Sequence, residues 1–95
     1  LGRWCIECKR YGDGSEPSAD WWNQVLIASR NDNQIPALVY KFNRKPLKVR
    51  ILASSINTEI ENQDITVDLS WEDFILIIKE LFLEDIDLHE QSPQV

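Results

Sequence analysis

Two pairs of chemically capable side chains share one short stretch near the start of the chain. Residues 3–9, RWCIECK, contain Cys5 and Cys8 three apart and Glu7 and Lys9 two apart. The cysteines suggest zinc or redox chemistry, whereas an acid beside a base suggests metal-assisted hydrolysis. The geometry of the stretch decides between these two interpretations.

The cysteine pair fits a metal or redox site poorly. Structural zinc takes four ligands, usually from two pairs, and this chain has one C-x2-C pair and a single histidine, His89. Residues 3–9 alternate as a strand does, so Cys5 and Cys8 are expected to point to opposite faces. A redox C-x-x-C lies at a helix start instead. We expect two small, half-buried side chains, with a zinc-bridged dimer as the alternative.

The same alternation places Glu7 and Lys9 on one face. A carboxylate is a hard oxygen ligand of the kind that Mg²⁺ prefers. A lysine ammonium can orient the attacking water or neutralise a phosphate in the transition state. By itself the E-x-K pattern is weak, because exposed strands often carry such pairs as solvated ions worth about 0–1 kcal/mol.

Charge is distributed unevenly along the 95 residues. The net charge is −6, but residues 1–52 carry +4 and residues 53–95 carry −10. A basic surface can therefore coexist with an acidic tail. The candidate phosphate-binding side chains are Arg10, Lys41, Arg44 and Lys45, and Lys48 and Arg50 add to the basic character of this half. The alternative is that these cations belong to solvated turns and bind no phosphate.

Periodicity and turn residues predict an α/β fold, a small mixed β-sheet flanked by helices. A helix follows the first strand and begins at a cap, Ser18 or Asp20. A second helix begins after Ser70, with Asp73 completing an approximate capping box. We expect strands at residues 3–9, 37–42, 47–52 and 65–69, helices at 19–30 and 71–82, a single domain over 1–83, and a fraying acidic tail over 84–95.

Three segments in this order resemble a known family. IECK, a helix containing WWNQ, and PALVYKFNRKPLKV are similar to the second half of the core of PD-(D/E)XK nucleases. The resemblance is greatest to Holliday-junction-resolvase-like and phage-type endonucleases. It covers residues 4–50 and implies a restriction-endonuclease-like core. It also implies that Glu7 is a metal ligand, Lys9 the catalytic lysine and Gln24 a supporting residue, with the Cys8 carbonyl completing the shell of Mg²⁺ or Mn²⁺.

The chain departs from the family pattern at one point. The family carries an aspartate on the strand before E-x-K, whereas no acidic residue precedes Glu7 here. We expect either that an upstream segment supplies this ligand, so that the sequence is N-terminally truncated, or that this copy is degenerate.

The resulting hypothesis is a fragment of a metal-dependent DNA endonuclease that hydrolyses phosphodiester bonds, including those of branched DNA. The alternative is an inactive nuclease-fold module that binds DNA or protein. Cleavage of a Holliday junction needs paired active sites, so the resemblance implies a homodimer for that substrate. The sequence has no transmembrane run and no signal-peptide pattern, which favours a cytoplasmic location with no membrane partner.

Overall fold

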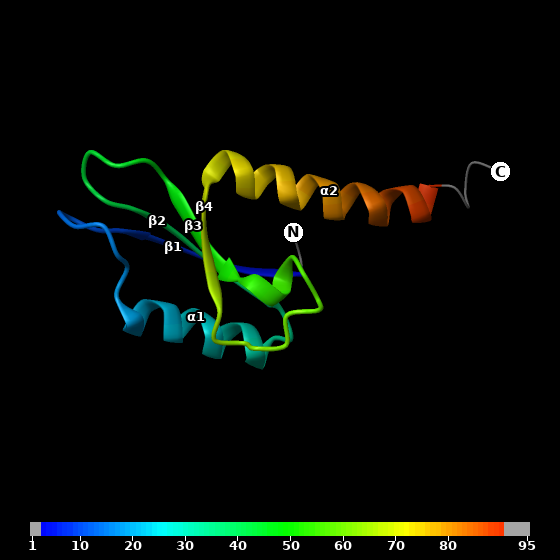
Figure 1. Cartoon of the computed structure of the whole chain (residues 1–95), viewed down its shortest axis with the longest axis horizontal. Helices are drawn as coiled ribbons and strands as arrows, with labels where there is room; N and C mark the ends of the chain where they lie inside the picture. Colours follow the sequence, from blue (N-terminus) through cyan, green and yellow to red (C-terminus); the bar gives the residue numbers. More distant parts are fainter. Residues whose placement is uncertain (1–2, 91–95) are drawn as a thin grey trace.

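The chain forms a mixed sheet with one helix on each face (Figure 1). The computed structural model describes residues 3–90, with side chains for residues 3–80. The elements follow one another as β1 (Trp4–Arg10), α1 (Ala19–Asn31), β2 (Ile35–Lys41), β3 (Lys48–Leu52), the short 3-10 helix η1 (Ala53–Ser55), β4 (Thr66–Ser70) and α2 (Trp71–Glu90). This order confirms the predicted α/β class and the predicted succession of elements.

The four strands lie in the order in which they occur in the sequence, β1-β2-β3-β4. β1 and β2 are parallel because α1 carries the chain back between them, whereas β2, β3 and β4 are antiparallel neighbours. The predicted hairpin of β2 and β3 is therefore confirmed. β1 and β4 form the two edges of the described sheet.

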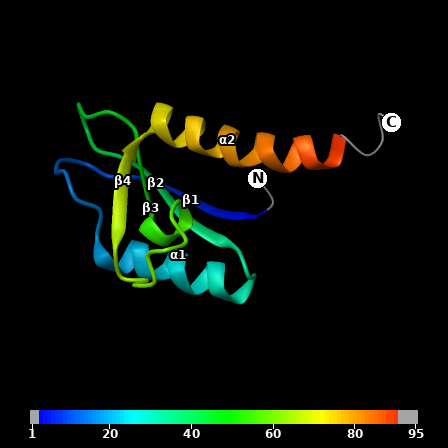
Figure 2. The same ribbon diagram turned by 45° about the vertical axis from the view of Figure 1, so that its right-hand side comes forward.

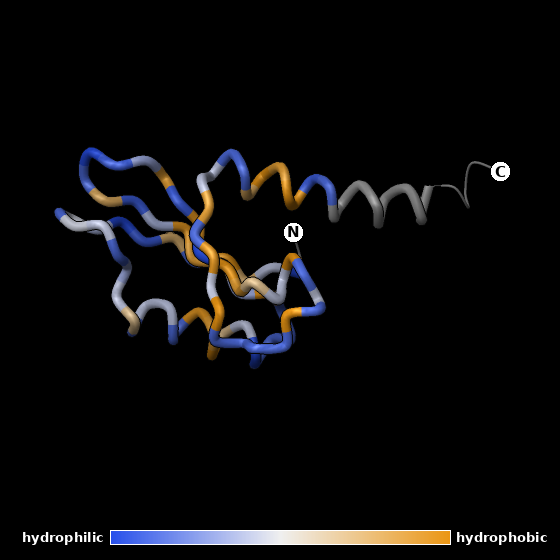
Figure 3. The backbone as a smooth tube through the Cα atoms, viewed as in Figure 1, coloured by the Kyte–Doolittle hydropathy of each residue, from blue (hydrophilic) through white to orange (hydrophobic). Residues whose placement is uncertain are grey.

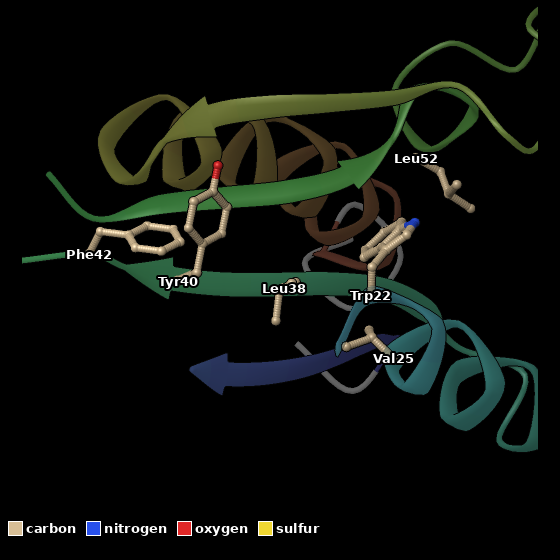
Figure 4. Close-up of a cluster of buried hydrophobic side chains, with 6 residues drawn as sticks. All are labelled: Trp22, Val25, Leu38, Tyr40, Phe42 and Leu52. Atoms are coloured by element: carbon tan, nitrogen blue, oxygen red, sulfur yellow. The ribbon is translucent and has the colours of Figure 1, made fainter. Parts of the chain in front are cut away.

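The helix α1 covers one face of β1 and β2. Ser18 is its N-cap, because its hydroxyl oxygen accepts a hydrogen bond from the Trp21 amide at 3.3 Å. Trp22 and Val25 project from α1 onto Leu38 of β2, as Figure 4 shows. The remaining buried members of this cluster, the α1-side core, are Tyr40, Phe42 and Leu52.

The helix α2 covers the opposite face. Ser70 caps it as predicted, since the Asp73 amide donates to the Ser70 hydroxyl at 3.1 Å. Phe74 is fully buried against the second cluster, the α2-side core, made of Ala37, Val39, Val49 and Ile51. The edge strand contributes Trp4, whose ring meets Phe74 edge-on at 5.3 Å between centroids.

The end of α2 departs from the prediction. We expected an acidic tail after residue 83, yet the helix runs to Glu90 and projects past the end of the sheet, as two views show (Figures 1 and 2). Acidic composition indicates exposure to water and does not prevent helix formation, because glutamate is a good helix former. The last part of the predicted tail, residues 91–95, lies outside the described chain.

Candidate active site and phosphate-binding surface

Glu7 and Lys9 lie on the α1 side of the edge strand β1. Their register partners on β2 are Leu38 and Tyr40, both members of the α1-side core. Glu7 is exposed, whereas the side chain of Lys9 is half-buried. The acid and the base therefore stand side by side on one face, as the two-residue period of a strand predicted.

An aromatic ring of α1 positions the lysine. The Lys9 Nζ lies 3.8 Å from the centroid of the Trp21 ring, a cation–π contact. Gln24 follows Trp21 by one helical turn and is exposed on the same flank of α1. The structure thus places Glu7 and Lys9 on the α1 side of β1, with Lys9 against Trp21 and the exposed Gln24 one helical turn further along α1.

The backbone of β1 offers a further oxygen beside Glu7. The Ile35 amide donates to the Arg3 carbonyl and the Tyr11 amide donates to the Lys41 carbonyl, so odd-numbered residues of β1 face β2. The carbonyl of Cys8 therefore points away from β2, toward the free edge. A carboxylate and a carbonyl are donors suited to Mg²⁺, which commonly takes its remaining ligands from waters and substrate phosphates.

This donor set is small. The described residues contain no group of three or more His, Cys, Asp or Glu side chains able to hold a metal ion. Within the described side chains, a divalent ion here would rest on Glu7 and the Cys8 carbonyl, with waters or substrate oxygens as its other ligands. The donors fit Mg²⁺ in kind, but they are few.

The two cysteines lie on opposite faces of β1, as predicted. Cys5 shares the face of Glu7, whereas Cys8 is exposed on the α2 side, and both are free thiols. Burial, together with the nearby charge of Glu7, raises the pKa of the Cys5 thiol. A raised pKa lowers the thiolate fraction, so Cys5 is a poor nucleophile at neutral pH.

Predicted phosphate ligands gather at one end of the sheet. The turn between β2 and β3 carries Arg44 and Lys45, both exposed, and Arg44 adopts a left-handed φ of 63°. The Asn43 amide donates to the Gly12 carbonyl at 2.9 Å, which joins this turn to the loop after β1. Both loops are hydrophilic at the same end of the molecule (Figure 3).

Arg10 and Lys41 belong to the same end but to the other face. They are register partners on β1 and β2, one residue past the row of Lys9 and Tyr40. Alternation therefore directs them to the α2 side, away from Glu7 and Lys9. The structure brings the four predicted phosphate ligands to one end of the sheet, but it splits them between its tip and the face opposite the E-x-K pair.

The expectation that Arg50 adds to the basic surface is wrong. Its guanidinium binds both carboxylate oxygens of Asp68 on the neighbouring strand β4, at 2.7 and 2.9 Å, and Glu16 at 3.1 Å. The Tyr40 hydroxyl donates to the same Asp68 carboxylate at 2.6 Å. Arg50 is thus neutralised within the fold. Sequence reasoning missed this cluster because only the strand register reveals that its members share a face.

Burial and the hydrogen bonds to Asp68 shift the pKa values of Tyr40 and Asp68. Burial first, and then the hydrogen bond to Asp68, raise the pKa of Tyr40 well above its usual range. For Asp68 burial acts upward, but the hydrogen bonds from Arg50 and Tyr40 outweigh it and hold its pKa below the usual value.

The lowered pKa of Asp68 makes the free energy of unfolding decrease at acidic pH. A carboxyl with a depressed folded-state pKa stabilises the fold above its unfolded pKa of about 4, and that contribution is lost as pH falls through the folded value. We expect Asp68→Asn to cost roughly 1–3 kcal/mol at pH 7, because a charged hydrogen-bond acceptor is lost. Urea unfolding at pH 7 and pH 3 measures this.

The matched control for that comparison is Asp64→Asn, an exposed acid in the loop before β4. We expect the cost of Asp68→Asn to shrink between pH 7 and pH 3, whereas Asp64→Asn changes little at either pH. An equal cost of Asp68→Asn at both pH values would contradict the role of its charge.

A separate hollow lies between η1 and α2. It has a volume of about 340 Å³ and is lined by Ile56, Leu76, Ile77 and Glu80. Its walls are almost entirely apolar, and β1 contributes none of them. The hollow is therefore a different feature from the E-x-K pair.

Comparisons of the chain with known protein families, curated proteins and solved structures find no match. Among the described residues, no helix has the length and hydrophobicity needed to cross a bilayer.

Proposed function

We propose that this protein binds the phosphate backbone of DNA and hydrolyses its phosphodiester bonds with a divalent metal, using Glu7 and Lys9. The observation that carries the proposal is the placement of Lys9, held over Trp21 beside the exposed Glu7. The basic end of the sheet, with Arg44 and Lys45 at its tip, supports a nucleic-acid substrate. The same proposal includes the assignment of this sheet and its helices to a restriction-endonuclease-like core.

Each residue has a defined part in this chemistry. Glu7 and the Cys8 carbonyl would hold Mg²⁺ or Mn²⁺, which supplies charge stabilisation for the phosphoryl oxygens when bound. Lys9 presents its ammonium to the phosphate or to the attacking water. The Trp21 ring restricts where that ammonium lies, so Trp21 is a positioning residue. Gln24, on the same flank, is placed to support a bound water or phosphate.

A second candidate function is a DNA-binding or protein-interaction module without hydrolysis. It is favoured by the absence of a cluster of three metal-ligating side chains among the described residues. Both functions retain the basic end of the sheet, so DNA binding alone does not distinguish them.

The test is cleavage of linear and branched DNA with Mg²⁺, with Mn²⁺ and with EDTA. Metal-dependent nicking that Glu7→Gln abolishes supports the nuclease. Saturable DNA binding with no nicking under any metal condition rejects hydrolysis and leaves the binding module. Neither nicking nor salt-sensitive binding would reject both functions.

Removing charge from the hairpin tip is expected to weaken DNA binding. The double variant Arg44→Ser, Lys45→Ser removes two exposed cations that would lie on phosphates. Each lost phosphate contact should reduce the slope of log K against log salt by about 0.9, so the pair should reduce it by nearly 2. Fluorescence anisotropy with labelled duplex at several salt concentrations measures this slope.

Arg30→Ser is the matched control for the hairpin variant. Arg30 is an exposed arginine in the last turn of α1, which lies at the opposite end of the sheet from the hairpin turn (Figure 1). Its replacement should leave the salt slope within error. Equal effects of Arg30→Ser and the hairpin variant would mean that binding follows net charge and not this surface.

A further inference from the structure

The turn between β2 and β3 carries an arginine where a smaller residue would fit the backbone better. The Lys45 amide donates to the Phe42 carbonyl at 3.2 Å, which closes a β-turn with Arg44 as its third residue. Arg44 has a φ of 63°, a left-handed conformation that glycine or asparagine adopts at lower cost. Backbone strain of this kind concentrates at functional sites, which points to a role for the arginine side chain.

Neighbouring residues hold this turn in place. The Asn43 amide donates to the Gly12 carbonyl at 2.9 Å, and the Asn43 side chain donates to the Asp13 carboxylate at 3.4 Å. At the base of the turn, Phe42 is buried and stacks on Tyr11 with the ring centroids 4.5 Å apart. The tip of the turn is therefore preorganised, which lowers the entropy cost of binding a ligand there.

Arg44 and Lys45 carry charge that the fold itself does not use. Both are exposed, and in the part of the chain that the structure describes neither has an ion-pair partner. Arg50, by contrast, is neutralised by Asp68 and Glu16. The strained turn thus presents two cations to a ligand outside the chain, and their charge is complementary to a phosphodiester backbone.

The width of this end of the sheet limits how it can meet DNA. The loop after β1 lies beside the turn, so three backbone segments are neighbours there. At about 4.8 Å between neighbours they span about 10 Å before side chains are added. The major groove is about 12 Å wide and admits a helix or a two-stranded ribbon. This end can therefore lie across a groove, with only its side chains reaching the base pairs.

We propose that Arg44 enters the minor groove of duplex DNA while Lys45 lies on a neighbouring phosphate. The substrate is then a duplex, since only paired strands form this groove. The contact rests on the DNA binding of the proposed function, but not on hydrolysis.

The minor groove accounts for an arginine at this position. The groove is about 6 Å wide, and in A-tracts it is narrower and its negative potential attracts arginine. A guanidinium is more weakly hydrated than an ammonium, so it leaves water at lower cost. In the groove Arg44 lies between the phosphates of both strands, so it still displaces counterions and the salt slope expected above is unchanged.

The position of the turn also sets where the proposed hydrolysis would occur. Glu7 is the register partner of Leu38, and Arg44 follows Leu38 by six residues. At about 3.3 Å per residue the separation is at most about 20 Å, or about six base pairs of B-DNA. Nicks are therefore expected within about six base pairs of an A-tract. This consequence rests on the proposed nuclease function, whereas the groove contact does not.

The test compares two labelled duplexes of equal length, one with a central A-tract and one of G·C pairs. Fluorescence anisotropy in EDTA reads binding alone, because metal-dependent cleavage is blocked. We expect the A-tract duplex to bind about fivefold more tightly or better. Netropsin, which fills the minor groove of A·T pairs, should displace the protein, and a single strand of the same length should bind more weakly.

Three variants assign the contact to Arg44. Arg44→Lys keeps the charge and the salt slope but should lose most of the A-tract preference. The matched control, Lys45→Ser, should lower the salt slope by about 0.9 and keep the preference. Arg44→Gly should also lose the preference, yet its urea midpoint should equal or exceed that of the parent, because glycine adopts this φ without strain.

The outcomes separate the groove contact from the nuclease. Equal affinity for both duplexes, or a preference that Arg44→Lys retains, overturns the contact even if the protein nicks DNA. A preference that Lys45→Ser also abolishes overturns the assignment to Arg44, and a lower midpoint for Arg44→Gly overturns the argument from strain. A preference without nicking under any metal condition supports the contact and rejects hydrolysis. Absence of DNA binding overturns both.

Discussion

Replacing Lys9 by methionine is expected to lower metal-dependent DNA cleavage by about 10²–10³-fold. That range corresponds to the loss of one preorganised group that stabilises transition-state charge. Methionine preserves an apolar stem against the Trp21 ring and removes the ammonium that lies 3.8 Å from its centroid. The expected loss is in kcat, because the charge acts on the phosphate as it reacts. Single-turnover nicking with saturating Mg²⁺ measures it.

The matched control is Lys48→Met. Lys48 lies on the same face and in the same row across the sheet, where Lys9, Tyr40 and Lys48 are successive register partners. It is exposed and has no acid beside it at the two-residue spacing of E-x-K. We expect its loss to weaken DNA binding slightly and to leave kcat within about twofold. Equal losses from both lysines would mean that Lys9 contributes only to the general basic character of this surface.

Replacing Phe74 by alanine is expected to destabilise the fold by about 3–5 kcal/mol. Phe74 is fully buried at the centre of the α2-side core and contacts Trp4 and Trp71. The free energy of unfolding of a small domain is only about 5–15 kcal/mol, so this loss leaves little margin. Urea unfolding followed by tryptophan fluorescence measures it.

Leu76→Ala is the control on the same helix. Leu76 lies two residues further along α2 and is 60% exposed, so its truncation should change stability by about 0.5 kcal/mol or less. A comparable cost for both variants would contradict the orientation of α2. If Phe74→Ala lowers the free energy of unfolding only slightly, α2 contributes little to the core.

Local patterns predicted most of the secondary structure. Ser18 and Ser70 cap the helices because a side-chain oxygen satisfies an amide that the first turn leaves unpaired. The two-residue period of β1 placed Glu7 and Lys9 together and separated the cysteines. These features depend on neighbours in the chain, so they can be inferred without knowing the tertiary structure.

Features that depend on which strands are neighbours were not predicted. The bonds of Arg50 and Tyr40 to Asp68 join three strands, and their residues lie up to 28 positions apart in the sequence. Sequence spacing alone made Arg50 look like a free cation. The split of Arg10 and Lys41 from the E-x-K face has the same origin, because strand register decides which side chains share a face.

The sequence by itself determined the alternation of β1, and with it the E-x-K pair as the candidate reactive site. Only the tertiary structure decided what surrounds that pair. Packing of α1 placed Trp21 against Lys9, and the order of the strands put β1 at one edge of the described sheet. The physical reason is that backbone geometry sets side-chain direction within a strand, whereas contacts between distant segments depend on how the whole chain packs.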